Sequence, residues 1–151
     1  MPGVIRIVLD TNVWLDWLVF YDPCVEPLRE AQAAGRAAIF LDAGCEAELV
    51  RVLAYDRGRR SLDARAQAAA LARCHAVAGF LPPVPDPAAA HAPMQLPACR
   101  DRDDQKFLEL ALAAGARDLV TKDKALLELA RRPLPFRILE PASWRLGENG
   151  A

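Results

Sequence analysis

Four acidic residues of this chain stand on different predicted elements but are expected to meet at one edge of a sheet: Asp10, Glu48, Asp104 and Asp123. Carboxylates that converge in a half-buried cleft repel one another, and some must take up protons unless a counter-charge is present. Hard divalent cations with oxygen ligands remove this conflict, and Mg²⁺ and Mn²⁺ fit best. Such a cation lowers the pKa of a bound water and polarises a phosphodiester. These residue types therefore indicate metal-assisted phosphodiester hydrolysis, which needs no nucleophilic side chain.

The first and last of these acids follow predicted strands. Asp10 comes directly after residues 4–9, a short β-branched run of the kind found in strands that are buried on both faces. Asp123 comes two residues after a predicted strand over 118–121. In parallel α/β sheets, sites form beyond the carboxyl ends of the strands. Both carboxylates are therefore expected at the same edge.

The other two acids lie on predicted helices, on faces that are otherwise apolar. Glu48 falls within the apolar stripe of a predicted helix over 43–55, and a carboxylate on a buried stripe needs a partner. Asp104 lies on the core face at the start of a predicted helix over 103–114. Taken singly, most of these acids are also explained as helix caps or turn residues. The coincidence of four at one edge favours a shared site.

The alternation of strands with helices predicts the fold class. The predicted strands are 4–9, 37–41, 118–121 and 136–139, with a short edge strand within 81–85, and the predicted helices are 13–20, 25–34, 43–55, 61–79, 103–114 and 124–131. This order indicates a three-layer α/β/α sandwich with a mainly parallel sheet of about five strands. The length of 151 residues suits a single domain over 1–151, with a core over about 4–141 and a frayed tail over 145–151.

Composition excludes several other classes of protein. Nineteen basic and twenty acidic residues give a net charge of -1, which neither demands nor excludes a nucleic-acid partner. The four cysteines form no C-x-x-C pair and there are two histidines, which argues against a zinc ribbon or finger. We expect the cysteines to be small buried residues in a reducing cytosol. No run of about 18 apolar residues exists, so we expect a cytoplasmic protein without a membrane partner.

Four short motifs follow one another along the chain around the acids. The first two are LDTNV at 9–13 and EAELVRVL at 46–53, and the last two are DRDDQKFLELA at 101–111 and LVTKD at 119–123. Together they resemble the motifs of the PIN-domain family, and the third resembles the form found in the toxin branch of that family. Each motif alone is weak, but the four in order span most of the chain.

The resemblance implies a five-stranded parallel sheet and an endonuclease that depends on Mg²⁺ or Mn²⁺, with RNA as the usual substrate. It frequently implies the toxin of a type II toxin–antitoxin pair, and therefore a cognate antitoxin protein and a homodimer as partners. It assigns the acid positions to Asp10, Glu48, Asp104 and Asp123, with Asp103 as a further candidate metal ligand. Asp16 and Asp42 depart from the family's usual residues, and each is expected either to add charge near the site or to cap a helix.

Neighbouring polar and basic residues are candidates for contacts with substrate. Thr11, Asn12 and Thr121 are hypothesised to orient a carboxylate, a water or a phosphate, although local turn hydrogen bonds explain them equally well. A basic rim is hypothesised to hold an RNA backbone, and a solvated surface is the alternative. This rim contains Arg57, Arg59 and Arg60, together with Arg51, Lys106, Lys122 and Lys124.

Two tryptophans of the first predicted helix have two interpretations. Trp14 and Trp17 belong either to the core or to a partner surface, and an exposed aromatic cluster would favour a dimer or antitoxin interface.

Two other functions remain as alternatives. A PIN-like module that binds RNA or protein without cutting it would keep the same fold. A phosphoacceptor receiver domain also gathers acids, a Thr and a Lys at the edge of a parallel sheet. A receiver, however, places paired acids after its first strand and an acceptor Asp after its third, whereas here two of the acids lie on helices.

Overall fold

A five-stranded sheet forms the centre of the molecule in the computed structural model, which describes residues 3–81 and 96–147. All four strand pairings are parallel, and the strand order is β3-β2-β1-β4-β5. The strands are β1 Ile5–Leu9, β2 Ala37–Leu41, β3 Ala78–Phe80, β4 Asp118–Val120 and β5 Arg137–Leu139. The prediction of a parallel sheet of about five strands is confirmed. Because β1 is the central strand, the residue that follows it stands in the middle of the sheet's carboxyl edge.

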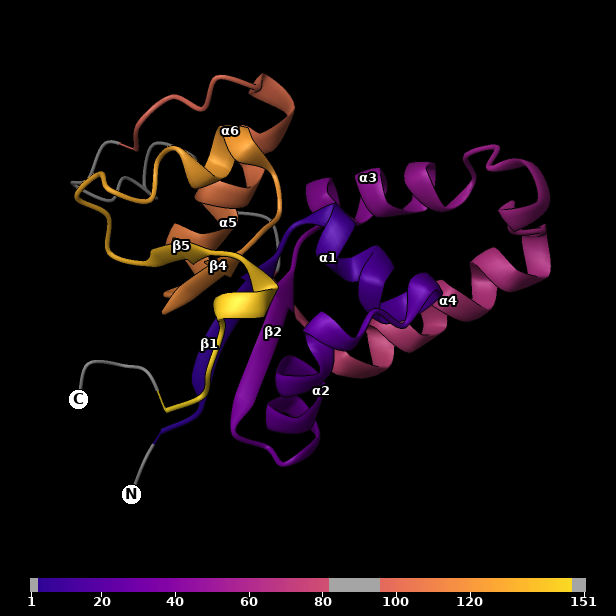
Figure 1. Cartoon of the computed structure of the whole chain (residues 1–151), viewed down its shortest axis with the longest axis horizontal. Helices are drawn as coiled ribbons and strands as arrows, with labels where there is room; N and C mark the ends of the chain where they lie inside the picture. The colour runs from indigo at the N-terminus through magenta and orange to yellow at the C-terminus, as the bar shows by residue number, and fades with distance from the viewer. Residues whose placement is uncertain (1–2, 82–95, 148–151) are drawn as a thin grey trace.

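Helices cover both faces of this sheet. They are α1 Thr11–Leu15, α2 Glu26–Ala33, α3 Ala43–Leu53, α4 Ala64–Val77, α5 Gln105–Ala114 and α6 Lys124–Leu127. Figure 1 shows α2 on one side of β1 and β2, and α5 on the other side, where it packs against β1, β2 and β4. The helix α3 contacts both α1 and α5 above the carboxyl ends of the strands. In the part of the chain that the structure describes, no helix has the length and apolar character needed to cross a membrane.

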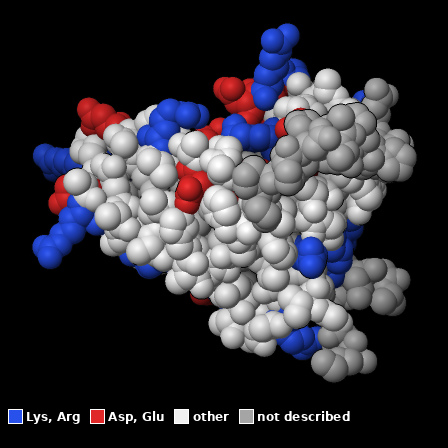
Figure 2. Space-filling view, turned by 180° about the vertical axis from the view of Figure 1, so that it is seen from behind, with Lys and Arg blue, Asp and Glu red and all other residues white. Residues whose placement is uncertain are grey.

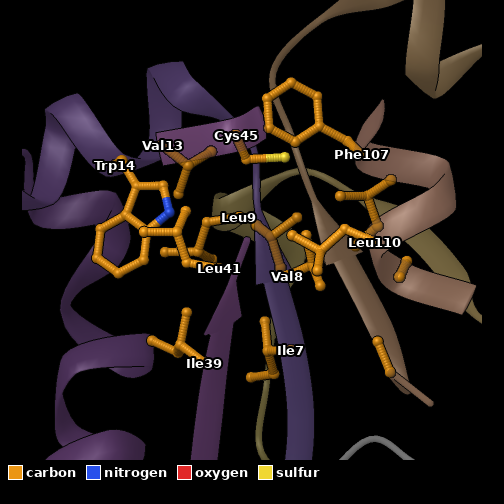
Figure 3. Packing of buried hydrophobic residues seen from close by; sticks show 14 of the residues in the cluster. Ile7, Val8, Leu9, Val13, Trp14, Ile39, Leu41, Cys45, Phe107 and Leu110 are labelled. Carbon is orange, nitrogen blue, oxygen red and sulfur yellow. The ribbon is translucent and has the colours of Figure 1, made fainter. Parts of the chain in front are cut away.

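Alternate residues of the central strands fill two apolar layers. Ile7, Val8 and Leu9 of β1 are fully buried. Figure 3 shows Trp14 and Ile39 on one side of the strands and Leu110 on the other. A strand that is buried on both faces needs an almost uninterrupted apolar sequence, and residues 5–9 supply one with a single Arg. The prediction of a doubly covered first strand is therefore correct.

Both tryptophans of the first helix belong to this core. Trp14 is 1% exposed and Trp17 is 6% exposed, and their rings lie 5.9 Å apart between centroids. This burial decides between the two interpretations of the pair, and it removes them as a partner surface.

The predicted helix over 13–20 differs from the observed backbone. The α-helical turns of α1 end at Leu15, and the chain continues as a π-helix over Asp16–Phe20 before it turns at Tyr21, which has φ 52°. The wider π turn inserts an extra residue per turn and changes the direction in which the following side chains point.

The predicted helix over 61–79 is wrong at its C-terminal end. The helix α4 ends at Val77, and Ala78–Phe80 forms the edge strand β3 beside β2. Gly79 permits this pairing, because a Cβ at that position would come within 3.1 Å of the Phe40 ring. The edge strand was predicted slightly too late, within 81–85, and the prolines of that stretch lie outside the described residues.

The four cysteines are all free, and three of them are buried. This agrees with the expectation that they act as small apolar residues.

A buried carboxylate on β4 ties the C-terminal segment to the sheet. Asp118 is fully buried and pairs with Arg117 at 2.7 Å and Arg137 at 2.8 Å. It also accepts a hydrogen bond of 2.9 Å from the indole Nε1 of Trp144, which is itself fully buried. Sequence reasoning missed this network, because Asp118 looks like an ordinary residue at the start of a strand.

Replacing this carboxylate tests how much the indole hydrogen bond stabilises the fold. Asp118→Ala should lower the free energy of unfolding by about 1–3 kcal/mol, because it leaves the buried indole N–H without an acceptor. Asp118→Asn keeps an acceptor oxygen and should cost less. Urea unfolding followed by tryptophan fluorescence measures both variants. Equal losses would show that the indole bond contributes nothing.

Candidate active site

Acidic side chains line a cavity of about 490 Å³ at the carboxyl edge of the sheet. They come from the end of β1, from α3, from the start of α5 and from the turn after β4, and they are Asp10, Glu48, Asp101, Asp103, Asp104 and Asp123. All four acids that the sequence predicted to meet at one edge therefore face the same cavity.

Asp10 is held at the centre of this group by two hydrogen bonds. Its Oδ1 accepts from the backbone N–H of Val13 at 3.0 Å, so Asp10 is also the N-cap of α1. Its Oδ2 accepts from the hydroxyl of Thr121. The side chain is 3% exposed, and burial raises its pKa to about 6 in spite of these hydrogen bonds, which act in the opposite direction.

Thr121 connects the acids that follow β1 and β4. Its hydroxyl oxygen donates to Asp10 and accepts from the backbone N–H of Asp123 at 2.9 Å. Asp123 in turn caps α6, because its Oδ1 accepts from the N–H of Ala125 at 2.8 Å. Asp123 therefore caps α6, as its position predicted, and it also lines the acidic cavity.

Asp104 carries the oxygen that most needs a cation. It ends the short 3-10 helix Arg102–Asp104 before α5, and it is 8% exposed. Among the described residues, its Oδ2 has no hydrogen-bond partner. Burial and the neighbouring carboxylates, chiefly Asp123, raise the pKa of Asp104 to about 7. A buried oxygen without a partner is costly, and a bound cation would satisfy it.

The ligand set fits a hard divalent cation. Carboxylate oxygens of Asp101, Asp104 and Asp123 all lie within 4.8 Å of one another. Oxygen-only ligands of this kind suit Mg²⁺ and Mn²⁺ better than softer metals. Asp10, Glu48 and Asp103, which the sequence also suggested as ligands, line the cavity but lie outside this cluster. Asp101, the N-cap of the 3-10 helix, belongs to it instead.

Glu48, which comes from α3, has a counter-charge of its own. Its Oε2 accepts from the hydroxyl of Thr11, and its Oε1 lies 2.5 Å from the ammonium of Lys106. Lys106 also donates to the backbone carbonyl of Asp103. The sequence identified Glu48 by its apolar helix face and placed Lys106 in the basic rim. The specific pairing was missed, because the two residues lie on different helices.

The two departures from the family's usual residues have different roles. Asp42 caps α3, where its Oδ1 accepts from the N–H of Cys45 at 2.9 Å. Asp16 is 5% exposed and lies 2.5 Å from the ammonium of Lys122, the residue next to Asp123. Asp16 thus ties the π-helix to the turn that carries Asp123, and this pairing raises the pKa of Lys122.

The predicted substrate contacts are divided between two places. Thr11, Asn12 and Arg57 line the acidic cavity. Arg59 and Arg60 line an adjacent cavity of about 450 Å³. On the face seen in Figure 2, Lys and Arg side chains are scattered among acidic ones and form no single basic field.

The raised pKa values predict how stability depends on pH without metal. The folded state keeps protons on Asp10 and Asp104 up to about pH 6 and 7, whereas the unfolded chain releases them near pH 4. Their contribution to stability is complete below about pH 4 and is lost as the pH rises through 6 and 7. In EDTA, Tm should therefore fall between about pH 5 and pH 7.5, and differential scanning calorimetry would measure it.

The matched variant is Asp104→Asn, which should flatten this decline because it removes one of the two groups. Mg²⁺ or Mn²⁺ at pH 7.5 should raise Tm of the wild type and have less effect on the variant. A wild-type Tm that is constant or rises over this pH range would contradict the assignment.

Comparison with known proteins places this arrangement in a family. The family model described as PIN domain matches residues 6–125, a span that contains α3, α5, β4, all but the first residue of β1 and all six acids of the cavity. A search among curated proteins gave no match. Proteins with PIN domains are generally metal-dependent nucleases. The resemblance that the four motifs indicated is confirmed, and the chain belongs to the PIN-domain family.

Proposed function

We propose that this protein is an endoribonuclease that hydrolyses RNA phosphodiester bonds with Mg²⁺ or Mn²⁺. Asp10, Glu48, Asp104 and Asp123 form its acidic centre, and Asp101 is a further ligand. The observation that carries the proposal is the buried Asp104 oxygen, which has no hydrogen-bond partner within residues 3–81 and 96–147. Asp101 and Asp123 bring carboxylate oxygens within 4.8 Å of Asp104 and of each other, close enough to share one cation. The family supports a metal-dependent nuclease, and RNA is the substrate that the motifs favour.

The chain's own groups prepare the cavity for a phosphodiester. A divalent cation bound here would polarise the phosphoryl group of the substrate and lower the pKa of a bound water. Thr121 fixes the orientation of Asp10, and Thr11 fixes that of Glu48. The ammonium of Lys106 brings a positive charge against Glu48 and the backbone carbonyl of Asp103. Thr11 and Thr121 thus act on carboxylates, which is one of the roles that their positions suggested.

The biological setting is part of the same proposal. The third motif, at 101–111, resembles the toxin branch of the family, and we infer a type II toxin with an antitoxin protein as its partner. Its four free cysteines suit the reducing cytoplasm, where such pairs act. A homodimer would be consistent with this role. The receiver alternative has no support, because the chain belongs to another family.

Cleavage assays test the centre directly. Wild type should cut a mixed RNA pool with Mg²⁺ or Mn²⁺ and not in EDTA. Asp104→Asn and Asp123→Asn should each lower the rate by about 100-fold or more, because each removes a charged ligand. Asp63→Asn is the matched control, because Asp63 is exposed, caps α4 and lines neither cavity. Denaturing gels of end-labelled RNA measure the products.

The contrary outcome has a definite meaning. If the wild type leaves RNA intact with either metal while binding it, the protein is a PIN-like binding module without catalysis. If the Asp104 and Asp123 variants cut as fast as Asp63→Asn, the acidic centre has been assigned to the wrong residues.

The three arginines at 57, 59 and 60 should contribute to RNA affinity through phosphate contacts. The triple variant Arg57→Ala, Arg59→Ala, Arg60→Ala should bind RNA more weakly, and the slope of log affinity against log salt should fall by about two to three. Fluorescence anisotropy over a salt series measures this slope. The double variant Arg131→Ala, Arg132→Ala removes two exposed arginines that line neither cavity, and its slope should not change.

A further inference from the structure

Two exposed aromatic rings border the acidic cavity. Phe20 is 42% exposed and Tyr55 is 51% exposed, and both line the cavity that holds the carboxylates. Phe20 ends the π-helix that follows α1, whereas Tyr55 lies just after the C-terminus of α3. These two elements are far apart in the sequence and bring their rings to one rim. Large aromatic groups are costly to leave in water, and placed beside a charged cavity they indicate a binding surface.

Phe20 also lines the second cavity, so that the two hollows are neighbours. This second cavity is lined by Phe20 and Val19 on one side and by Arg59, Arg60, Ser61 and Leu62 on the other. A path over Phe20, the residue that lines both cavities, therefore connects the carboxylates with Arg59 and Arg60. Tyr55 lies on the acidic side of this path.

Both rings stand on segments that are fixed to the site. The π-helix that ends at Phe20 begins at Asp16, which pairs with Lys122 beside Asp123. On the other side, the guanidinium of Arg57 donates to the carbonyls of Val52 at 2.7 Å and Tyr55 at 3.3 Å. These bonds close the end of α3, and Val52, Tyr55 and Arg57 all line the acidic cavity. A ring on a held segment loses little conformational entropy when a ligand stacks on it.

We propose that Phe20 and Tyr55 form a base-stacking subsite that takes one strand of RNA next to the cleavage centre. The inference rests on the proposed nuclease function and names the binding mode of its substrate. Stacking uses the flat face of any base, so the subsite tolerates different sequences. The strand has to be single, because the bases of a duplex are already stacked on each other. The phosphates that follow the stacked bases reach Arg59 and Arg60.

The charge distribution favours RNA over a protein as the occupant. The whole chain has a net charge of -1, and the arginines at the far end of the path are a local source of positive charge. A polyanion with flat apolar rings matches the aromatic part and the basic part together, and its phosphodiester links match the acids once a cation is bound.

Binding is measured without cleavage in the Asp10→Asn background, by fluorescence anisotropy of a labelled oligo(A) strand. Adding Phe20→Ala or Tyr55→Ala should raise the Kd about tenfold each. Phe80→Ala is the matched control, because Phe80 is 49% exposed but lines a separate cavity with Glu46 and His75. It should leave the Kd unchanged, and the Tm of each variant checks its fold.

Three further probes separate stacking from charge. An abasic strand of the same length keeps the phosphates but has no rings, so its Kd should be the same with and without Phe20 and Tyr55. Oligo(A) annealed to oligo(U) should bind more weakly than oligo(A) alone. Oligo(dA) should show the same loss in the two ring variants, because stacking does not read the 2′-hydroxyl.

The outcomes distinguish this inference from the proposed function. The subsite would be overturned if both ring variants kept the wild-type affinity for oligo(A), or if they lost as much affinity for the abasic strand as for oligo(A). A protein partner would then be the better explanation for the exposed rings. If the ring variants lose oligo(A) affinity while the wild type cuts no RNA, the subsite stands and the nuclease proposal fails. If the wild type cuts RNA and the ring variants bind oligo(A) normally, the nuclease proposal stands and the subsite fails.

Discussion

Carboxylates that lose water at the carboxyl end of the sheet have to be held together against their own repulsion. The fold meets this cost in part with protein groups: one hydroxyl for Asp10, another hydroxyl and an ammonium for Glu48, and backbone N–H donors for Asp10 and Asp123. Asp104 is less well compensated, and burial together with Asp123 raises its pKa to about 7. The remaining imbalance is what a divalent cation corrects, so the instability of the empty site and its affinity for metal have the same cause.

Glu48 and the aspartate cluster differ in how far protein groups compensate their negative charge. Glu48 already has the ammonium of Lys106 at 2.5 Å, whereas in the cluster of Asp101, Asp104 and Asp123 one Asp104 oxygen has no hydrogen-bond partner among the residues that the structure describes. A cation therefore gains most on the aspartate side. Glu48 can act as a ligand only if it shares or exchanges its lysine, which makes the two sides unequal in affinity for metal.

Short stretches of sequence were enough to predict the parallel sheet and the meeting of the four acids at one edge. Strand burial, helix faces and strand ends can each be recognised from a few neighbouring residues. It was not enough for Lys106, Asp118 or Asp16, whose partners lie on other elements and depend on packing. The end of α4 was predicted two residues too late because α-helical propensity continues through Ala78, whereas pairing with β2 decides the backbone there. The presence of Asp101 rather than Asp103 in the cluster depends on three-dimensional positions that the sequence does not reveal.

The position of β1 in the sheet also bears on the order of folding. The hydroxyl that orients Asp10 belongs to Thr121, 111 residues later in the chain. Parallel pairing of β1 with β4 is a long-range contact, and forming it costs much chain entropy. A chain still growing on the ribosome, or one cut short before residue 118, therefore has no assembled centre. Such a fragment lacks both the hydroxyl that orients Asp10 and the carboxylate of Asp123.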